Sequence, residues 1–424
     1  MPRLHQRGTF QMHRAQSFRK KMQIARRPIL QRLPLSTIFL TTSLRATGPT
    51  KMFAQVIVPT YPGRDELRFL WVVHKAVEKL KSDLCLICPS GYWRDVDRIV
   101  EEVRSAPPSN YDYLKSRDLS QKLVNTLFRR SVTWPLPDEL CTAESAWVHR
   151  ITQEISDVAK QISDILRSFQ NTEAILTWTN CATLRCVSRD LGIRLIHNEV
   201  GPLRPPHYKA TGYFDFAGVG QSTGAIARWV RFRDERANVP LHSLPELAEM
   251  FLSSTSPKPK EVTHHVGVSL QDAEQEDLSG ISNAKLIELV RKNFEGPILC
   301  RLHPAQDTAL EIDDVDLDNS ISSIEFISKV EVLVTVNSGI GVEAMLHGKR
   351  VYSLGDPPYK YNSCNLGTKS ANLGDAESLE WVNWFLFCYL IPFERLFDSA
   401  YYRWRLGDPP ESEIYFDNYR HWHR

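Results

Sequence analysis

The feature that most constrains the fold is a regular alternation between short apolar runs and longer amphipathic stretches. The runs 53–58 and 84–88 are each followed by a helical pattern, at 65–80 and 93–103. A longer pattern over 144–169 repeats apolar side chains every three or four residues, which predicts a helix with one buried stripe. Strands that alternate with helices predict a parallel sheet covered on both faces.

A polar segment with two prolines, 253–260 (SSTSPKPK), separates this series from a second one and reads as a linker. The second series has a helical pattern at 284–293 and strand patterns at 266–270, 298–302, 331–336 and 351–354. A chain of 424 residues is also too long for one ordinary core. We therefore expect an α/β protein with two Rossmann-like domains that face a cleft.

The expected domains follow from these patterns. The first spans 52–255 and the second 262–375, and the aromatic-rich segment 376–424 is expected to be helical and to pack back on the first domain. Residues 1–51 carry eleven Lys and Arg, and the first acidic residue of the chain is Asp65. This extension is interpreted as disordered; a transit-like presequence, an upstream segment that is not normally translated and an arm that binds anionic lipid are the alternatives.

Composition narrows the classes of function. The formal net charge is +2, so the overall charge gives no argument for nucleic-acid binding. No stretch reaches the ~20 apolar residues that span a bilayer, and 381–393 reads as a buried or interfacial helix. Cys85 and Cys88 form a C-x-x-C inside an apolar run, without a second pair at zinc spacing. Buried free thiols in a reducing compartment are therefore expected, and no metal site.

The sharpest polar cluster is the sequence 337–344, which follows an apolar strand pattern. Asn337 or Ser338 can cap the helix that starts there, and Gly339 allows a ligand to approach the backbone closely. Exposed N–H groups at a helix start favour a phosphate. Glu343, about one turn later, could accept hydrogen bonds from sugar hydroxyls. An ordinary capped turn between strand and helix is the alternative.

Two further strand ends in the second half carry polar residues. Arg301 and His303 end the 298–302 strand, and Pro304 stops it, which places His303 at the tip of the sheet. Gln271 and Asp272 follow the 266–270 strand, where a catalytic carboxylate would lie. A helix cap or a solvated acidic loop is the alternative for Asp272.

In the first half, Glu199 and Arg204 follow a strand pattern at 193–197. Gly and Pro residues lie between them and predict a rigid turn that presents both charges; a surface ion pair is the alternative. Downstream, 213–215 and the Gly-rich loop 218–223 could line the same cleft.

Together these motifs resemble the bacterial capsule and lipopolysaccharide transferases that add Kdo, an acidic ketose, from CMP-Kdo with retention of configuration. The resemblance covers roughly 173–225 and 262–365, and rests on 198–205, 270–272, 301–304 and 337–344. The His-Pro pair and the Ser-containing turn also look like those of bacterial sialyltransferases. Both groups have the GT-B architecture of two Rossmann-like domains.

The resemblance implies a role for each candidate residue. Asp272 would be the nucleophile and Glu199 the acid/base, as a retaining double displacement needs two carboxylates. The nucleotide and sugar would be held by Gln271, Arg301, His303, Pro304, Asn337, Ser338, Gly339 and Glu343, with Arg204 on an acidic group of the sugar. His303 and the turn amides would neutralise the leaving phosphate, so neither a metal nor another cofactor is expected.

The implied function is a cytoplasmic glycosyltransferase, at the inner face of the cytoplasmic membrane, that extends a surface polysaccharide. Its partners would be a nucleotide sugar and a glycan or glycolipid acceptor. The basic extension or the aromatic side chains of 381–389 could contact a membrane. Two alternatives remain: a GT-B transferase that uses CMP-sialic acid or a UDP- or GDP-sugar, and a catalytically silent partner in polysaccharide assembly or export.

Overall fold

The computed structural model describes residues 51–59, 67–92, 95–135, 143–169, 171–272, 276, 278–303, 314–367 and 373–423. The chain divides into two compact units, Met1–Gly48 and Pro49–Arg424. All described residues belong to the second unit. Residues 1–50 of the basic extension and Pro304 lie outside the described residues.

The first sheet has seven strands in the order β12-β6-β5-β4-β1-β2-β3. Its strands are β1 (Met52–Val56), β2 (Leu84–Cys88), β3 (Phe128–Ser131), β4 (Thr172–Thr177), β5 (Arg194–Val200), β6 (Thr211–Asp215) and β12 (Leu390–Pro392). Strands β1 to β5 run parallel. Of these, β1, β2, β4 and β5 agree with the predicted parallel sheet, whereas β3 lies in a region for which no strand was predicted. Strands β6 and β12 extend the sheet by antiparallel pairing, which the sequence analysis did not predict.

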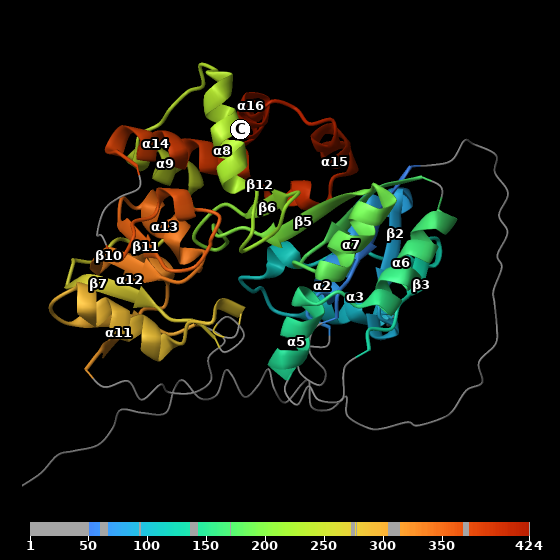
Figure 1. Ribbon diagram of the computed structural model, residues 1–424, viewed down its shortest axis with the longest axis horizontal. Coiled ribbons are helices and arrows are strands. Elements are labelled where there is room, and N and C mark those ends of the chain that lie inside the picture. The colour runs from blue at the N-terminus through green and yellow to red at the C-terminus, as the bar shows by residue number, and fades with distance from the viewer. Residues whose placement is uncertain are drawn as a thin grey trace, which may run out of the picture. The chain divides into compact units, whose positions relative to one another are not determined.

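Helices cover both faces of this sheet (Figure 1). One face packs against α2 (Leu70–Leu80), α3 (Val96–Ser105) and α4 (Gln121–Asn125). The other packs against α5 (Ala143–Thr152), α6 (Ser156–Ser168) and α7 (Ala182–Leu191). The single helix predicted over 144–169 is therefore wrong. The chain breaks before α6 because the Ile155 amide donates to the Thr183 hydroxyl, 3.0 Å away, instead of to a helical carbonyl.

The second sheet is fully parallel, in the order β11-β10-β7-β8-β9. Its strands are β7 (His264–Ser269), β8 (Ile298–Arg301), β9 (Asp316–Leu317), β10 (Val330–Thr335) and β11 (Arg350–Ser353). Helix α11 (Asn283–Asn293) packs on one face, and α12 (Ser323–Ser328) and α13 (Ile340–Leu346) pack on the other. The predicted linker, 253–260, contains no helix or strand.

The C-terminal segment returns to the first sheet, as predicted. Helix α14 (Asp375–Trp384) continues into a π-helical turn, Phe385–Tyr389, and then into β12, which pairs with β6. Helices α15 (Ser399–Leu406) and α16 (Glu411–Trp422) follow. Figure 1 shows α14 and α16 gathered with α8 (Ala225–Glu235) and α9 (Leu244–Phe251). Two Rossmann-like sheets with a returning C-terminal segment form the GT-B architecture; the domain boundaries at 255, 262 and 375 stay predictions.

The aromatic side chains of the C-terminal segment lie inside this core. Trp381, Trp384, Phe385, Phe387 and Tyr389 are at most 2% exposed. The expectation that they could contact a membrane is therefore wrong, because their rings are already packed against α8, α9 and α16. In the part of the chain that the structure describes, every helix is too short or too polar to cross a bilayer.

The cysteines agree with the sequence analysis as far as they are described. Seven are buried and free, and Cys141 lies outside the described residues. On β2, burial raises the pKa of both Cys85 and Cys88 to about 12, so these thiols stay protonated at neutral pH.

Candidate functional site

Three neighbouring strands of the second sheet end at residues that the sequence analysis singled out. Asp272 follows β7, His303 follows β8, and the turn of Asn337, Ser338 and Gly339 follows β10. The carboxyl ends of parallel strands lie at one edge of a sheet, where ligands of open α/β sheets bind. The order of the parallel strands therefore brings these predicted residues to one edge of the second sheet.

Backbone hydrogen bonds shape the turn after β10. The Ser338 carbonyl accepts from the Gly341 amide at 3.1 Å and from the Tyr359 hydroxyl at 2.5 Å. Helix α13 begins with Gly339 as its N-cap and has no side-chain capping bond. The N-cap position is therefore Gly339, and of the two predicted caps only Ser338 contributes, because its hydroxyl accepts from the amide of Ile340, the first helical residue, at 3.5 Å.

Both glycines of this region are needed for close packing. A Cβ atom on Gly341 would stand 2.5 Å from the Tyr359 ring, and one on Gly339 would stand 3.1 Å from the Cβ of Pro202. Pro202 belongs to the turn after β5 of the first sheet. The candidate turns of the two sheets are therefore in contact.

The Glu199 segment differs from the prediction. Strand β5 continues to Val200, so Glu199 lies within the strand, opposite Tyr213 on β6, and not in the turn after it. Arg204 folds back over the turn, and its Nε donates to the Gly201 carbonyl at 2.6 Å. The side chain of Glu199 is half-buried, whereas Arg204 is exposed.

Glu343 lies in a buried polar cluster. It is 8% exposed and accepts a hydrogen bond from the Ser323 hydroxyl at 2.6 Å. Burial raises the pKa of this carboxyl, while Ser323, the charge of Arg204 and the Tyr208 hydroxyl act in the opposite direction. Arg204 of the first half and Glu343 of the second are therefore electrostatically coupled.

Asp272 and His303 form a pair. The Nδ1 atom of His303 lies 3.4 Å from Oδ2 of Asp272, and both side chains are partly exposed. Adjacent strands explain this pairing, because β7 and β8 end next to each other. The structure thus places side by side two residues to which the sequence analysis gave different roles, Asp272 as the nucleophile and His303 as a ligand of the leaving phosphate. The acidic residues at 274 and 277 lie outside the described residues.

Two predicted ligand-binding residues make side-chain hydrogen bonds within the protein. Arg301 donates to Asp318 at 2.6 Å and to the Ser320 carbonyl at 3.2 Å. Burial alone would raise the pKa of Asp318, but hydrogen bonds from Ser320, Lys329 and Arg301 lower it. The amide of Gln271 donates to the Ile281 carbonyl at 2.8 Å. Both residues stiffen the strand ends that carry His303 and Asp272, and their contact with a ligand stays a prediction.

The loop expected to line the cleft from the first half is organised by Asp215. This carboxylate is 2% exposed and accepts from the amides of Ala217 and Gly224 and from the Tyr389 hydroxyl, at 2.7 to 2.9 Å. Asp215 therefore supports the loop and does not itself line a cleft. Ser222 of the loop donates its amide to Asp356 at 3.0 Å.

Sequence reasoning missed several residues of the site. Tyr208, Ser323 and Tyr359 hold Glu343 and the 337–339 turn, and Asp356 holds the Gly-rich loop. Asp356 and Tyr359 belong to Asp-Pro-Pro-Tyr directly after β11, another strand end of the same sheet. Because polar residues at strand ends were the pattern used to find the other candidates, the position of this motif after a strand could have identified Asp356 and Tyr359 as well. Among the described residues, no group of three or more His, Cys, Asp or Glu is arranged to hold a metal ion.

Comparison with family models decides the class of protein. Residues 56–224 match the glycosyltransferase 99 family N-terminal domain, and residues 306–365 match the capsule polysaccharide biosynthesis protein family. The resemblance to capsule-type glycosyltransferases is confirmed. These matches cover Glu199, the turn that ends at Arg204, and the 337–344 segment of the glycosyltransferase.

Several solved structures match this chain at low similarity. The beta Kdo 2,7 transferase of Thermosulfurimonas dismutans KpsC is 19% identical, covers 55% of this chain and 82% of its own, and has a TM-score of 0.38. Its beta Kdo 2,4 transferase is 15% identical, with coverages of 52% and 81% and a TM-score of 0.35. Spinosyn forosaminyltransferase SpnP is 10% identical, with coverages of 87% and 95% and a TM-score of 0.31. Likeness of this degree assigns neither a substrate nor residue roles. A search among curated proteins gave no match.

Proposed function

We propose that this glycosyltransferase moves Kdo from CMP-Kdo to a capsule-type or lipopolysaccharide glycan, with retention of configuration. The observation that carries the proposal is the contact between the two candidate turns. The turn that contains Gly339 lies at the same edge of the second sheet as Asp272 and His303. Gly339 touches Pro202, which belongs to the turn after Glu199, so this contact brings the two groups of candidate residues together. The family-model matches support the class of reaction.

Two carboxylates divide the chemistry in this proposal. Asp272 attacks the anomeric carbon, the bond from that carbon to the phosphate oxygen breaks, and CMP leaves. Glu199 then takes the proton of the acceptor hydroxyl as this oxygen displaces Asp272. Two successive displacements restore the original configuration. In this proposal His303 lies beside the attacking carboxylate, with its Nδ1 atom 3.4 Å from Oδ2 of Asp272.

The leaving phosphate is stabilised without a metal ion in this proposal. The backbone N–H groups of the 337–339 turn and the imidazole of His303 supply hydrogen bonds to the developing charge. Arg204, whose charge already acts on Glu343, orients the carboxylate of the Kdo unit. The expected result is activity that persists in EDTA.

The decisive experiment measures CMP release by the full chain with CMP-Kdo, a capsule-type acceptor and EDTA. Asp272→Asn and Glu199→Gln are expected to lower the rate by at least about a hundred-fold. Asp316→Asn is the matched control, because that carboxylate is 64% exposed and lies on β9. NMR of the product anomer distinguishes retention from inversion.

Other outcomes would replace the proposal. An unchanged rate of CMP release in both variants would show that Asp272 and Glu199 are not the catalytic carboxylates. Turnover with CMP-sialic acid alone, or thermal stabilisation by UDP or GDP but not by CMP, would change the donor. No stabilisation by any nucleotide would favour a silent partner in polysaccharide assembly or export.

The proposed place of action is the inner face of the cytoplasmic membrane, where a lipid-linked acceptor would be met. With the aromatic rings of the C-terminal segment buried, residues 1–51 are the segment assigned to membrane contact. Their eleven Lys and Arg side chains would attract anionic lipid. Unchanged partition onto anionic vesicles after deletion of 1–51 would contradict this assignment.

A further inference from the structure

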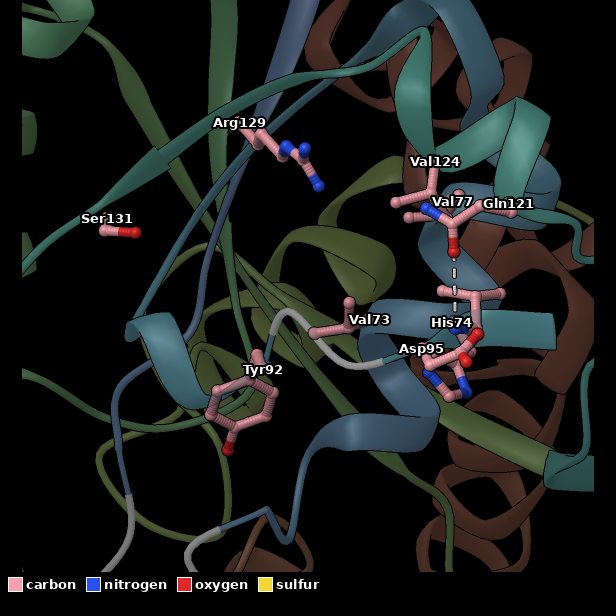
Figure 2. Close-up of a pocket in the computed structure, with 10 residues that line it drawn as sticks. Val73, His74, Val77, Tyr92, Asp95, Gln121, Val124, Arg129 and Ser131 are labelled. Atoms are coloured by element: carbon pink, nitrogen blue, oxygen red, sulfur yellow. Dashed lines mark hydrogen bonds between the residues drawn. The ribbon is translucent and has the colours of Figure 1, made fainter. Parts of the chain in front are cut away.

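A cavity of about 680 Å³ lies in the first half of the molecule, between α2, the start of α3, α4 and β3 (Figure 2). Polar groups of its lining bond within its own wall. The side chain of Gln121 accepts from the Val96 amide at 3.4 Å. The carboxylate of Asp95 accepts from the Arg98 amide at 3.5 Å and so caps α3. These contacts hold the wall together, and a stronger candidate for an unassigned role lies at α13, where the two halves meet.

Helix α13 presents two polar side chains on one face. Glu343 and His347 are four residues apart, which places them one above the other on the same side of the helix. The helix has Gly339 as its N-cap and His347 as its C-cap, so these two residues are about 12 Å apart along the axis. A group that holds His347 can therefore move the turn assigned to the donor phosphate without touching a phosphate bound there.

Tyr208 of the first half lies against this face of α13. Its hydroxyl is hydrogen bonded to Nε2 of His347 at 3.0 Å, and the same phenol interacts with Glu343. Burial raises the pKa of Tyr208, and the neighbouring carboxylate raises it further. Tyr208 is 3% exposed, so its hydroxyl depends on these two side chains for its hydrogen bonds.

The hydrogen bonds of this group form a chain with one direction. The carboxylate of Glu343 accepts from the Ser323 hydroxyl at 2.6 Å and from the Tyr208 hydroxyl. Burial lowers the pKa of His347, and the charge of Lys349 acts in the same direction, so this ring is neutral at pH 7. Because the single proton of Tyr208 goes to Glu343, the Nε2–H group of His347 donates to the phenol oxygen.

Tyr208 is also tied to the turn that ends at Arg204. Its amide donates to the Arg204 carbonyl at 3.0 Å, and Tyr208 pairs with Leu252 in an isolated β-bridge. Burial raises the pKa of Glu343, and the charge of Arg204 opposes this shift. Hydrogen bonds through Tyr208 therefore connect the turn assigned to the sugar carboxylate with the helix that starts at the turn assigned to the phosphate.

We propose that Tyr208 is a positioning residue: its hydroxyl fixes α13, and with it the 337–339 turn, relative to Arg204. The phosphate and the sugar carboxylate of the donor then meet their partners at the correct separation. The inference rests on the proposed transferase function and deepens it. It also gives Glu343 a role other than the nucleotide contact that the resemblance implied, because this carboxylate acts on the helix through Tyr208 and Ser323.

The test measures nucleotide affinity of the full chain by calorimetry, with CMP, UDP and GDP. Tyr208→Phe keeps the ring and removes the hydroxyl. It is expected to weaken nucleotide binding about ten-fold, because small displacements of positioning groups are costly in a preorganised site. Tyr415→Phe is the matched control, since the buried Tyr415 hydroxyl donates to the Pro240 carbonyl at 2.5 Å and its loss removes a similar hydrogen bond. The control should leave nucleotide affinity unchanged.

His347 supplies a readout that a general loss of stability would not change. His347→Leu is expected to weaken nucleotide binding as much as Tyr208→Phe, although this side chain lies at the far end of α13. His347→Gln keeps an N–H donor and should restore most of the affinity. The double variant of Tyr208→Phe and His347→Leu should bind no more weakly than either single variant, because both changes remove the same link.

The outcomes separate this inference from the proposed function. Unchanged affinity in Tyr208→Phe, equal losses in Tyr208→Phe and Tyr415→Phe, or multiplied losses in the double variant would overturn the positioning role. Binding of UDP or GDP in place of CMP would overturn only the donor, and the variants would then be compared with that nucleotide. If no nucleotide binds, the proposed function fails and hydrogen exchange of the 337–346 amides decides the inference. Faster exchange in Tyr208→Phe than in Tyr415→Phe is expected, and equal exchange would overturn it.

Discussion

Gly339 and Pro202 touch across the two halves of the site, since a Cβ atom on the glycine would stand 3.1 Å from the Cβ of the proline. This contact sets the distance between the turn assigned to the donor phosphate and the turn that follows Glu199. A change of a few tenths of an ångström at this point alters both turns together. The candidate site is therefore sensitive to substitutions that leave every polar group in place.

The Gly339→Ala variant is expected to weaken CMP binding by about ten-fold, because small displacements of positioning groups are costly in a preorganised site. Calorimetric titration with CMP checks this. Gly367→Ala is the control, because a Cβ atom there would meet nothing within 4 Å. Equal affinity in both variants would show that the contact with Pro202 does not position the turn.

The Gly341→Ala variant is expected to lower the free energy of unfolding by about 1–3 kcal/mol, the usual cost of overpacking. The added methyl would stand 2.5 Å from the ring of Tyr359, which is fully buried. Urea unfolding of the variant and of Gly91→Ala, where the added atom has open space, provides the comparison. A Gly341→Ala midpoint no lower than that of the control would contradict the packing.

Loss of Arg228 from its buried pair with Glu411 is expected to cost about 1.5–3 kcal/mol, because Glu411 loses the charged hydrogen bonds from Arg228 and keeps only Arg231, 3.1 Å away, as an ion-pair partner. Arg228 Nε lies 2.9 Å from Glu411 Oε1, and Glu411 is 1% exposed. Arg228→Met can be measured against Arg167→Ala, which removes a pair with Asp164 that is about 60% exposed on both sides. The surface pair should cost less than about 1 kcal/mol.

The stability of the fold is expected to fall as pH decreases from 6.5 to about 4, in part through His197. This histidine is fully buried, and burial, aided by the charge of Arg185, lowers its pKa from 6.5 to about 4. Below pH 6.5 the unfolded chain binds the proton and the folded chain does not, so up to about 3 kcal/mol is lost across this window. His197→Phe should flatten the dependence in urea unfolding at a series of pH values. If the free energy of unfolding varied with pH in the same way for both proteins, His197 would be excluded as the source of the pH dependence.

The sequence predicts the parts of the fold that depend on local pattern. The alternation of apolar runs and helical patterns predicted the parallel strands except β3 and β9, which pair at the edges of the two sheets. The prolines predicted the 253–260 linker, and the aromatic-rich C-terminal segment was expected to return to the first domain. The parts that depend on distant partners were missed. The 144–169 pattern splits because Thr183 takes the Ile155 amide, and β5 reaches Glu199 because β6 pairs with it.

In the candidate site too, features set by the local sequence pattern were predicted, and features set by distant partners were missed. Strand ends could be read from the sequence, so Asp272, His303 and the 337–339 turn were found and lie at one edge of a sheet. Burial at a contact between the two halves could not be read, so the surroundings of Glu343 were missed. Its neighbours Ser323 and Tyr208 come from segments far apart in the chain, and no spacing rule connects them.

Strand β12 has a consequence for the order in which the protein is made. The first sheet contains residues from Met52 to Pro392, and its edge strand β6 receives its partner only when the C-terminal segment is available. Translation delivers the second sheet before that partner. A ribosome-bound chain therefore holds the first sheet with β6 unpaired, and its aromatic core incomplete, until almost the entire chain has emerged.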